Sequence, residues 1–118
     1  MQMTTALLMA NPCDDEEDNL AMLCCHSDKG EMFLITRYPD EAEVEITLDD
    51  KSSTLEGLKI TLSPTRLLLE VAPSDTDALN NSDHLEIIHS TDADELAQIE
   101  QALKNILTGT GTYISELS

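Results

Sequence analysis

The stretch Leu55–Val71, LEGLKITLSPTRLLLEV, limits the folds open to this chain more than any other stretch does. Apolar residues alternate with polar ones on both sides of a short turn, at Leu58, Ile60, Leu62, Leu67, Leu69 and Val71. A period of two places each apolar set on one face of a β-strand. Ser63 and Pro64 suit the first two positions of a tight turn. The sequence therefore predicts a hairpin with one apolar face, and we expect the helix that begins near Asp92 to cover it.

The length of 118 residues suits one domain, residues 1–118, with a single modest core. Hydrophobic residues make up 41% of the chain, which is typical of folded proteins. One Phe, two Tyr and no Trp leave few large anchors, so we expect an aliphatic core. Residues 1–19 form either a first strand or a partly ordered arm, because their periodicity favours neither.

The balance of charge is strongly negative. Twenty-four acidic residues against six basic ones give a formal net charge of -18. Such a field repels nucleic acid and anionic membrane surfaces, and it attracts basic proteins. A plain role in solubility, or adaptation to high salt, would explain the same excess.

Cysteine usage and the amino-terminal residues indicate a cytoplasmic protein. Cys13 and the adjacent Cys24 and Cys25 make an odd number of thiols without a disulfide framework. The first residues contain a short apolar run without a preceding basic residue, which is a poor signal peptide. No stretch approaches the roughly 18 apolar residues of a membrane span.

Further strands are predicted at 20–26, 31–37, 42–48 and 84–89. The stretch 31–37 is apolar on both faces, which suggests a central position in the sheet, whereas 49–54 is polar and turn-like. A short helical turn is expected after Pro73. A long helix with an apolar stripe should follow Asp92 and stop at Gly109. The tail at Tyr113 and Ile114 either joins a sheet edge or is loose.

The elements add up to an α+β fold. We expect one antiparallel sheet of five to six strands with one long C-terminal helix packed on one face.

Acidic residues gather around the predicted strand 42–48. Glu43 and Glu45 share its outward face, because residues two apart lie on one side of a strand. Four more acids stand at its two ends: Asp40, Glu41, Asp49 and Asp50. Focused fields speed the encounter with basic proteins, so we predict that these six residues form a partner-binding patch. Lys51 or Lys59 would neutralise part of it across the sheet. An ordinary solvated face is the alternative.

No set of residues is typical of catalysis or of metal binding. Cys24 and Cys25 point to opposite faces of a strand and complete no zinc spacing, so buried small apolar residues explain them better. The acidic loop Asp14–Asp18 lacks the ligand spacing and the central Gly of a calcium site. His84 and His89 have no nucleophile that can be tied to them. We therefore predict no enzyme, no cofactor and no bound metal.

The order of segments between Thr47 and Leu107 carries a family resemblance. An acidic, serine-rich turn (Leu48–Ser53) precedes a Gly-centred strand start (Leu55–Leu58) and a hairpin with the return strand Leu67–Leu69. A Pro-led short helix that ends near Leu79, one more strand (Leu85–Ile87) and the closing helix (Leu96–Leu107) follow. This order resembles that of the bacterial polymorphic-toxin immunity proteins, most closely the tenth immunity family. The resemblance covers about half of the chain.

The resemblance implies a non-enzymatic inhibitor that binds a cognate toxin domain in the cytoplasm and blocks it. The charge fits independently, because nuclease toxins must hold phosphates and are often basic. We expect a protein partner, with no direct contact to nucleic acid or membrane, and either a monomer or a homodimer. The resemblance transfers no set of binding residues, so the six-acid patch rests on the strand argument alone.

Two other binding functions remain open. Type III secretion chaperones are small acidic α+β dimers that hold an effector segment, but they usually open with an amphipathic helix, and 1–19 offers no good one. An acidic decoy that imitates nucleic-acid phosphates is the third interpretation.

Overall fold

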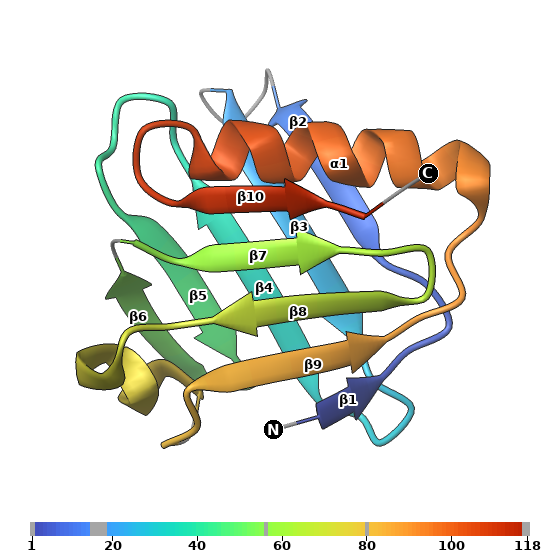
Figure 1. Ribbon diagram of the computed structural model, residues 1–118, viewed down its shortest axis with the longest axis horizontal. Coiled ribbons are helices and arrows are strands. Elements are labelled where there is room, and N and C mark those ends of the chain that lie inside the picture. Colours follow the sequence, from blue (N-terminus) through green and yellow to red (C-terminus); the bar gives the residue numbers. More distant parts are fainter. Residues whose placement is uncertain (1, 15–18, 56, 80, 117–118) are drawn as a thin grey trace.

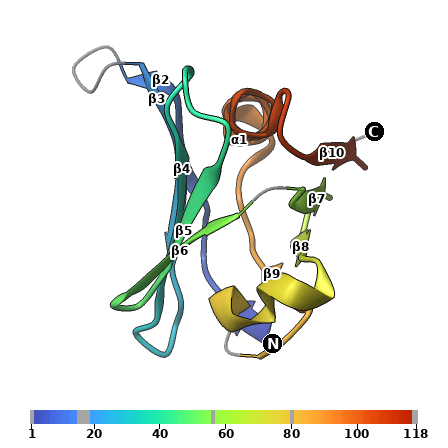
Figure 2. The ribbon, with the colours of Figure 1, turned by 90° about the vertical axis from the view of Figure 1, so that its left-hand side faces the viewer.

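The computed structural model describes residues 2–14, 19–55, 57–79 and 81–116. In these residues, ten strands form two five-stranded sheets, and one long helix lies between the sheets at one end of the molecule (Figures 1 and 2). Sheet A contains, in spatial order, β1 (Gln2–Thr4), β9 (His84–Ile88), β8 (Arg66–Glu70), β7 (Lys59–Leu62) and β10 (Thr112–Ser115). Sheet B contains β2 (Met9–Asp14), β3 (Leu20–His26), β4 (Met32–Arg37), β5 (Val44–Leu48) and β6 (Lys51–Leu55).

The α+β class and the long C-terminal helix α1 (Ala93–Leu107) are confirmed. The expectation of one sheet with five to six strands falls short, because the strands divide between two sheets. Part of the difference between the predicted and the observed number of strands comes from the polar segment 49–54, which was expected to be a turn throughout. Asp49 and Asp50 form the turn, and Lys51–Leu55 is an edge strand. An edge strand with little burial needs no apolar alternation, so periodicity alone does not reveal it.

The hairpin of β7 and β8 forms as predicted. Leu62 pairs with Leu67, and Ser63 closes the turn through its N–H, which donates to the Arg66 carbonyl at 2.8 Å. The four inward side chains are fully buried: Ile60, Leu62, Leu67 and Leu69. Their cover differs from the prediction. Sheet B faces them across the core, while α1 contacts β2, β3 and β10 and closes one end of the space between the sheets (Figure 2).

The opposite end of the core is closed by a 3-10 helix, η2 (Pro73–Leu79), where a helical turn was predicted. It contacts β5, β6 and β9, and it buries Ala78 and Leu79. Both sheets and both helices thus contribute to one aliphatic core, in which Phe33 is the largest fully buried side chain. The predicted central position of 31–37 is also confirmed, since β4 is the third strand of sheet B.

Helix α1 buries the predicted stripe of Leu96, Ile99, Leu103, Ile106 and Leu107, together with Ala102. Asp92 occupies the N-cap position, but its side chain makes no capping hydrogen bond. At the other end Gly109 has a φ of +79°, a value that favours glycine and ends the helix. Arg37 of β4 donates to the carbonyls of Ile106 and Thr108, which fastens this end to sheet B.

The tail joins a sheet edge, one of the two outcomes left open. β10 runs parallel to β7, with Tyr113 beside Ile60. Gly111 makes this return possible, because a Cβ there would lie 2.4 Å from the Leu58 carbonyl oxygen. At the other end of the chain, β1 and β2 show that most of 1–14 is strand rather than a loose arm. No helix in the described residues is long and apolar enough to cross a membrane.

Candidate functional site

The six predicted partner-binding acids are all exposed, and they lie on or next to β5. Glu45 is the one acid within the strand itself, and it points away from the core between the buried Val44 and Ile46. Glu43 lies in the bend just before the strand, because β5 begins at Val44 rather than at Ala42. We expected Glu43 and Glu45 to lie on the same strand, but only Glu45 lies on β5.

The other four acids form two pairs, one at each end of β5. Asp40 and Glu41 belong to the turn after β4, where the Glu41 N–H donates to the Tyr38 carbonyl at 3.1 Å. Asp49 and Asp50 form the β5–β6 turn. A five-residue strand rises about 16 Å, at roughly 3.3 Å per residue, so the two pairs lie well apart. The set is a line of charge along one strand rather than a compact cluster.

Asp49 is the most strongly held of the six. Its φ of 56° is left-handed, which Asp tolerates better than most residues. Its N–H donates to the Met32 carbonyl at 2.8 Å, and its Oδ1 accepts the Met32 N–H at 3.0 Å. These two bonds fix the turn against the start of β4.

The predicted neutralisation of the patch by lysine is wrong for Lys59. That residue lies on β7 of the other sheet, with its Nζ 3.8 Å from a Glu70 carboxylate oxygen. The Lys51 Nζ donates to the Asp77 carbonyl of η2. Within the described residues, none of the six carboxylates forms an ion pair. Their charge is therefore available to a partner.

An apolar surface that was not predicted from the sequence lies beside these acids. Six outward positions of β2, β3 and β4 carry apolar side chains, which we call the apolar outer face: Met9, Leu20, Met22, Cys24, Met32 and Leu34. Met9 is 41% exposed, and the other five are half-buried. Three polar residues lie on the same side of the sheet, with Asn11 and Thr36 beside Met22 and the exposed His26 beside Met32. A signal was present in the sequence, since Met32 and Leu34 alternate with the core residues Phe33 and Ile35. That pattern indicates a central strand, and it does not reveal that only one face is covered.

The two adjacent cysteines lie as expected for packing residues. Cys25 is fully buried, whereas Cys24 is half-buried on the apolar outer face. Burial raises the pKa of the Cys24 thiol, and burial together with the neighbouring Cys24 raises the pKa of Cys25 to about 11. A reactive cysteine needs the opposite shift, because the thiolate is the nucleophile. The side chains of Cys13 and Asp14, and residues 15–18 of the acidic loop, lie outside the described part of the chain.

The two histidines of the β9 region differ in their surroundings. His84 is exposed, and its Nδ1 lies 2.8 Å from a carboxylate oxygen of Asp83, a hydrogen bond that lowers the pKa of that carboxyl. His89 is 1% exposed, and its Nδ1 lies 3.0 Å from the Thr91 hydroxyl. Burial lowers the pKa of His89, while backbone groups of Ser63 and Arg66 act in the opposite direction. Its Nε2 is buried, and no hydrogen-bond partner for it is found among the described residues.

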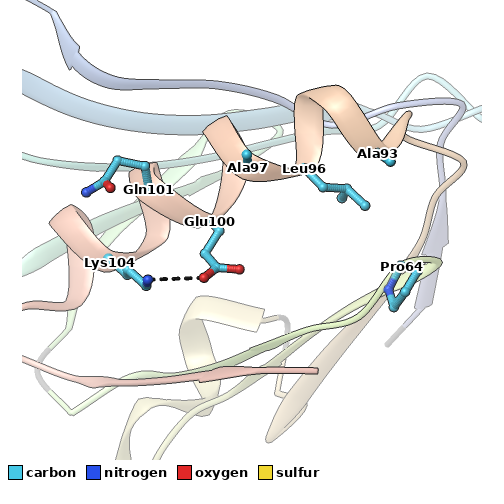
Figure 3. A pocket seen from close by; sticks show the side chains of 7 residues that line it. All are labelled: Pro64, Ala93, Leu96, Ala97, Glu100, Gln101 and Lys104. Carbon is cyan, nitrogen blue, oxygen red and sulfur yellow. Dashed lines mark ion pairs between the residues drawn. The ribbon is translucent and has the colours of Figure 1, made fainter. Parts of the chain in front are cut away.

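A groove of about 510 Å³ runs along the exposed side of α1 (Figure 3). Pro64 of the β7–β8 turn lies across from the helix, and Glu100 and Lys104 form an ion pair of 3.1 Å on successive helical turns. The Ser115 hydroxyl also donates to Glu100, at 3.1 Å. The bond to Lys104 is the main cause that lowers the pKa of Glu100. The Ser115 bond links β10 to α1, whereas the ion pair with Lys104 lies within the helix, so both charged groups of this pair already have a partner in the fold.

No group of three or more His, Cys, Asp or Glu residues in the described part of the chain is arranged to hold a metal ion. Comparison with known proteins gave no significant match to any family model, curated protein or solved structure. The resemblance to the tenth immunity family stays a prediction.

Proposed function

We propose that this protein is a non-enzymatic immunity protein, which binds a basic bacterial toxin domain in the cytoplasm and neutralises it. One observation carries the proposal: six exposed acids lie on β5 or at its two ends in a chain of net charge -18, and none of them forms an ion pair with another described residue. A toxin that cleaves nucleic acid needs a positive cleft for phosphates. A line of acids is complementary to such a cleft and would exclude the substrate by occupying it.

The structure gives less support to a secretion chaperone. Such chaperones usually open with an amphipathic helix, for which 1–19 offers no good sequence pattern, and the structure has the strands β1 and β2 there. A chaperone would also hold an extended effector segment, whereas a line of fixed charges suits a folded basic surface.

The first experiment is a pull-down from the source organism at low salt, with a high-salt wash and mass spectrometry. We expect a stoichiometric basic domain that is toxic when expressed alone and harmless when it is expressed together with this protein. Recovery of an unfolded effector segment would favour the chaperone instead. A recovered domain whose toxicity is unchanged by co-expression would contradict the immunity function.

The role of the acidic line is tested by Glu43→Lys with Glu45→Lys. Asp94→Lys with Glu116→Lys is the matched control, because both are exposed acids away from β5 and each double variant changes the net charge from -18 to -14 (each reversal adds two). At low salt we expect the β5 variant to associate about tenfold more slowly with the toxin domain, since fixed charge steers encounter. The difference should shrink at 1 M salt, where screening acts over about 3 Å. Equal rates for both variants would remove the line from the mechanism.

A further inference from the structure

The outer faces of the two sheets differ, although each sheet has five strands and an apolar inner face. Sheet A carries cross-strand ion pairs on its outside, with Arg66 2.9 Å from Glu86 and Lys59 3.8 Å from Glu70. Leu68, on the central strand β8, lies among these groups. A face of this mixed character is usual for a sheet that meets water.

Sheet B is different, because apolar side chains lie next to one another across three strands. The pairing places Cys24 between Met9 and Leu34 in one cross-strand row. Met22 belongs to the next row, and Met32 is the next outward residue to Leu34 along β4. Strands lie about 4.8 Å apart and outward residues along a strand about 6.6 Å apart, so these side chains form one continuous surface. None of the described elements covers this side of sheet B (Figure 2).

The acids of β5 border this surface. Glu45 is paired in register with Thr36, which lies beside Met22. Asp49 is hydrogen-bonded to the backbone of Met32. An apolar centre with a charged border is the usual composition of a protein-protein interface.

We propose that the apolar outer face is the centre of a docking surface for a folded protein that carries an apolar patch within a ring of Lys and Arg. The acidic border supplies the charge complementarity. A second copy of this chain is a poor occupant, because two molecules of net charge -18 repel each other. An anionic membrane is repelled in the same way. Three of the six side chains are Met, whose flexible thioether adapts to an irregular partner surface.

This inference rests on the proposed function and deepens it. The acids explain how a basic partner approaches, and the apolar outer face explains how the complex persists after encounter. Charge at the border mainly changes association rates, whereas a desolvated centre mainly changes dissociation rates. The two surfaces therefore have separate kinetic signatures.

The test is Leu34→Asp, with Leu68→Asp as its matched control. Both leucines are half-buried, and both point outward from the third strand of a five-stranded sheet. The probe is the basic domain recovered in the pull-down, and its association and dissociation rates with each folded variant are measured by surface plasmon resonance. We expect Leu34→Asp to raise Kd at least about 30-fold, mainly through faster dissociation, as for the loss of a central interface side chain. Leu68→Asp should change Kd less than about threefold.

The possible outcomes separate the docking surface from the proposed function. If the toxin domain binds and is neutralised, but both variants bind it equally well, the docking surface is wrong and the immunity function stands. If no basic domain is recovered, a photo-reactive residue is placed at Met22, with one at Thr61 of sheet A as the control. If neither residue cross-links a basic protein in cells, the docking surface and the immunity function are both wrong. A cross-link to a basic protein from Met22 and not from Thr61 would support the docking surface. Cross-links from Met22 only to a second copy of the chain would overturn the proposal in favour of a homodimer.

Discussion

Leu103→Ala tests whether α1 is part of the core or only rests on its edge. Leu103 is fully buried in the C-terminal half of the helix, and α1 contacts strands of both sheets through β2, β3 and β10. Replacing Leu by Ala removes three carbons. At about 0.8 kcal/mol for each buried methylene, the transfer free energy alone is roughly 2.4 kcal/mol.

A cavity adds to this cost, because the surrounding structure relaxes only in part. Both sheets are hydrogen-bonded across five strands, and Arg37 fastens the end of α1 to β4, so the walls around Leu103 have little freedom to move inward. We therefore expect the free energy of unfolding to fall by about 2 to 5 kcal/mol. For a domain of this size the melting temperature should fall by roughly 8 to 20 °C.

The assay is urea unfolding followed by circular dichroism, since the chain has no Trp to serve as a fluorescent probe. Leu7→Ala is the matched control, because Leu7 is 43% exposed and loses the same three carbons. We expect less than about 1 kcal/mol for the control. If Leu103→Ala also costs less than about 1 kcal/mol, the stripe of α1 does not face a packed core.

The other predictions concern one buried histidine and one close backbone approach. Burial lowers the pKa of His89 in the folded state, so below about pH 6.5 the unfolded state binds more protons and stability falls with falling pH until the folded pKa is passed. Urea unfolding between pH 5 and 7.5 should show a steeper fall for the wild type than for His89→Gln, and parallel profiles would contradict this. Gly111→Ala should cost about 1 to 3 kcal/mol, because its Cβ would meet the Leu58 carbonyl oxygen at 2.4 Å and the neighbouring backbone must shift. A cost within about 0.5 kcal/mol in the same urea assay would show that β10 adjusts freely.

Much of the fold follows from local pattern. The hairpin around Ser63 and Pro64, the stripe of α1 and the stop at Gly109 each depend on neighbouring residues, and each forms as predicted. The second sheet does not follow from local pattern. The edge strand β1 pairs with β9, which lies far along the chain, and β10 pairs with β7 only because Gly111 permits a close return. Long-range pairing of this kind leaves little trace in periodicity.

The candidate site was predicted in composition but not in shape. All six acids are exposed, yet their distribution along β5 depends on where the strand begins and on the turn at Asp49. The predicted role of Lys59 failed because the two lysines were assumed to lie on one sheet. Sequence distance between Glu45 and Lys59 says nothing about which sheet each strand joins.

The acidic excess and the apolar outer face are best understood together. A half-exposed surface around Met22 and Leu34 favours self-association, which proteins usually prevent with charge at or near such a surface. A net charge of -18 keeps copies of this chain apart while it leaves the same surface open to a basic protein. The charge therefore selects the partner, and it does so by repelling the wrong molecules as much as by attracting the right one. Solubility alone requires charge but no particular placement, whereas this selection requires acids at the border of the apolar outer face, where Glu45 and Asp49 lie.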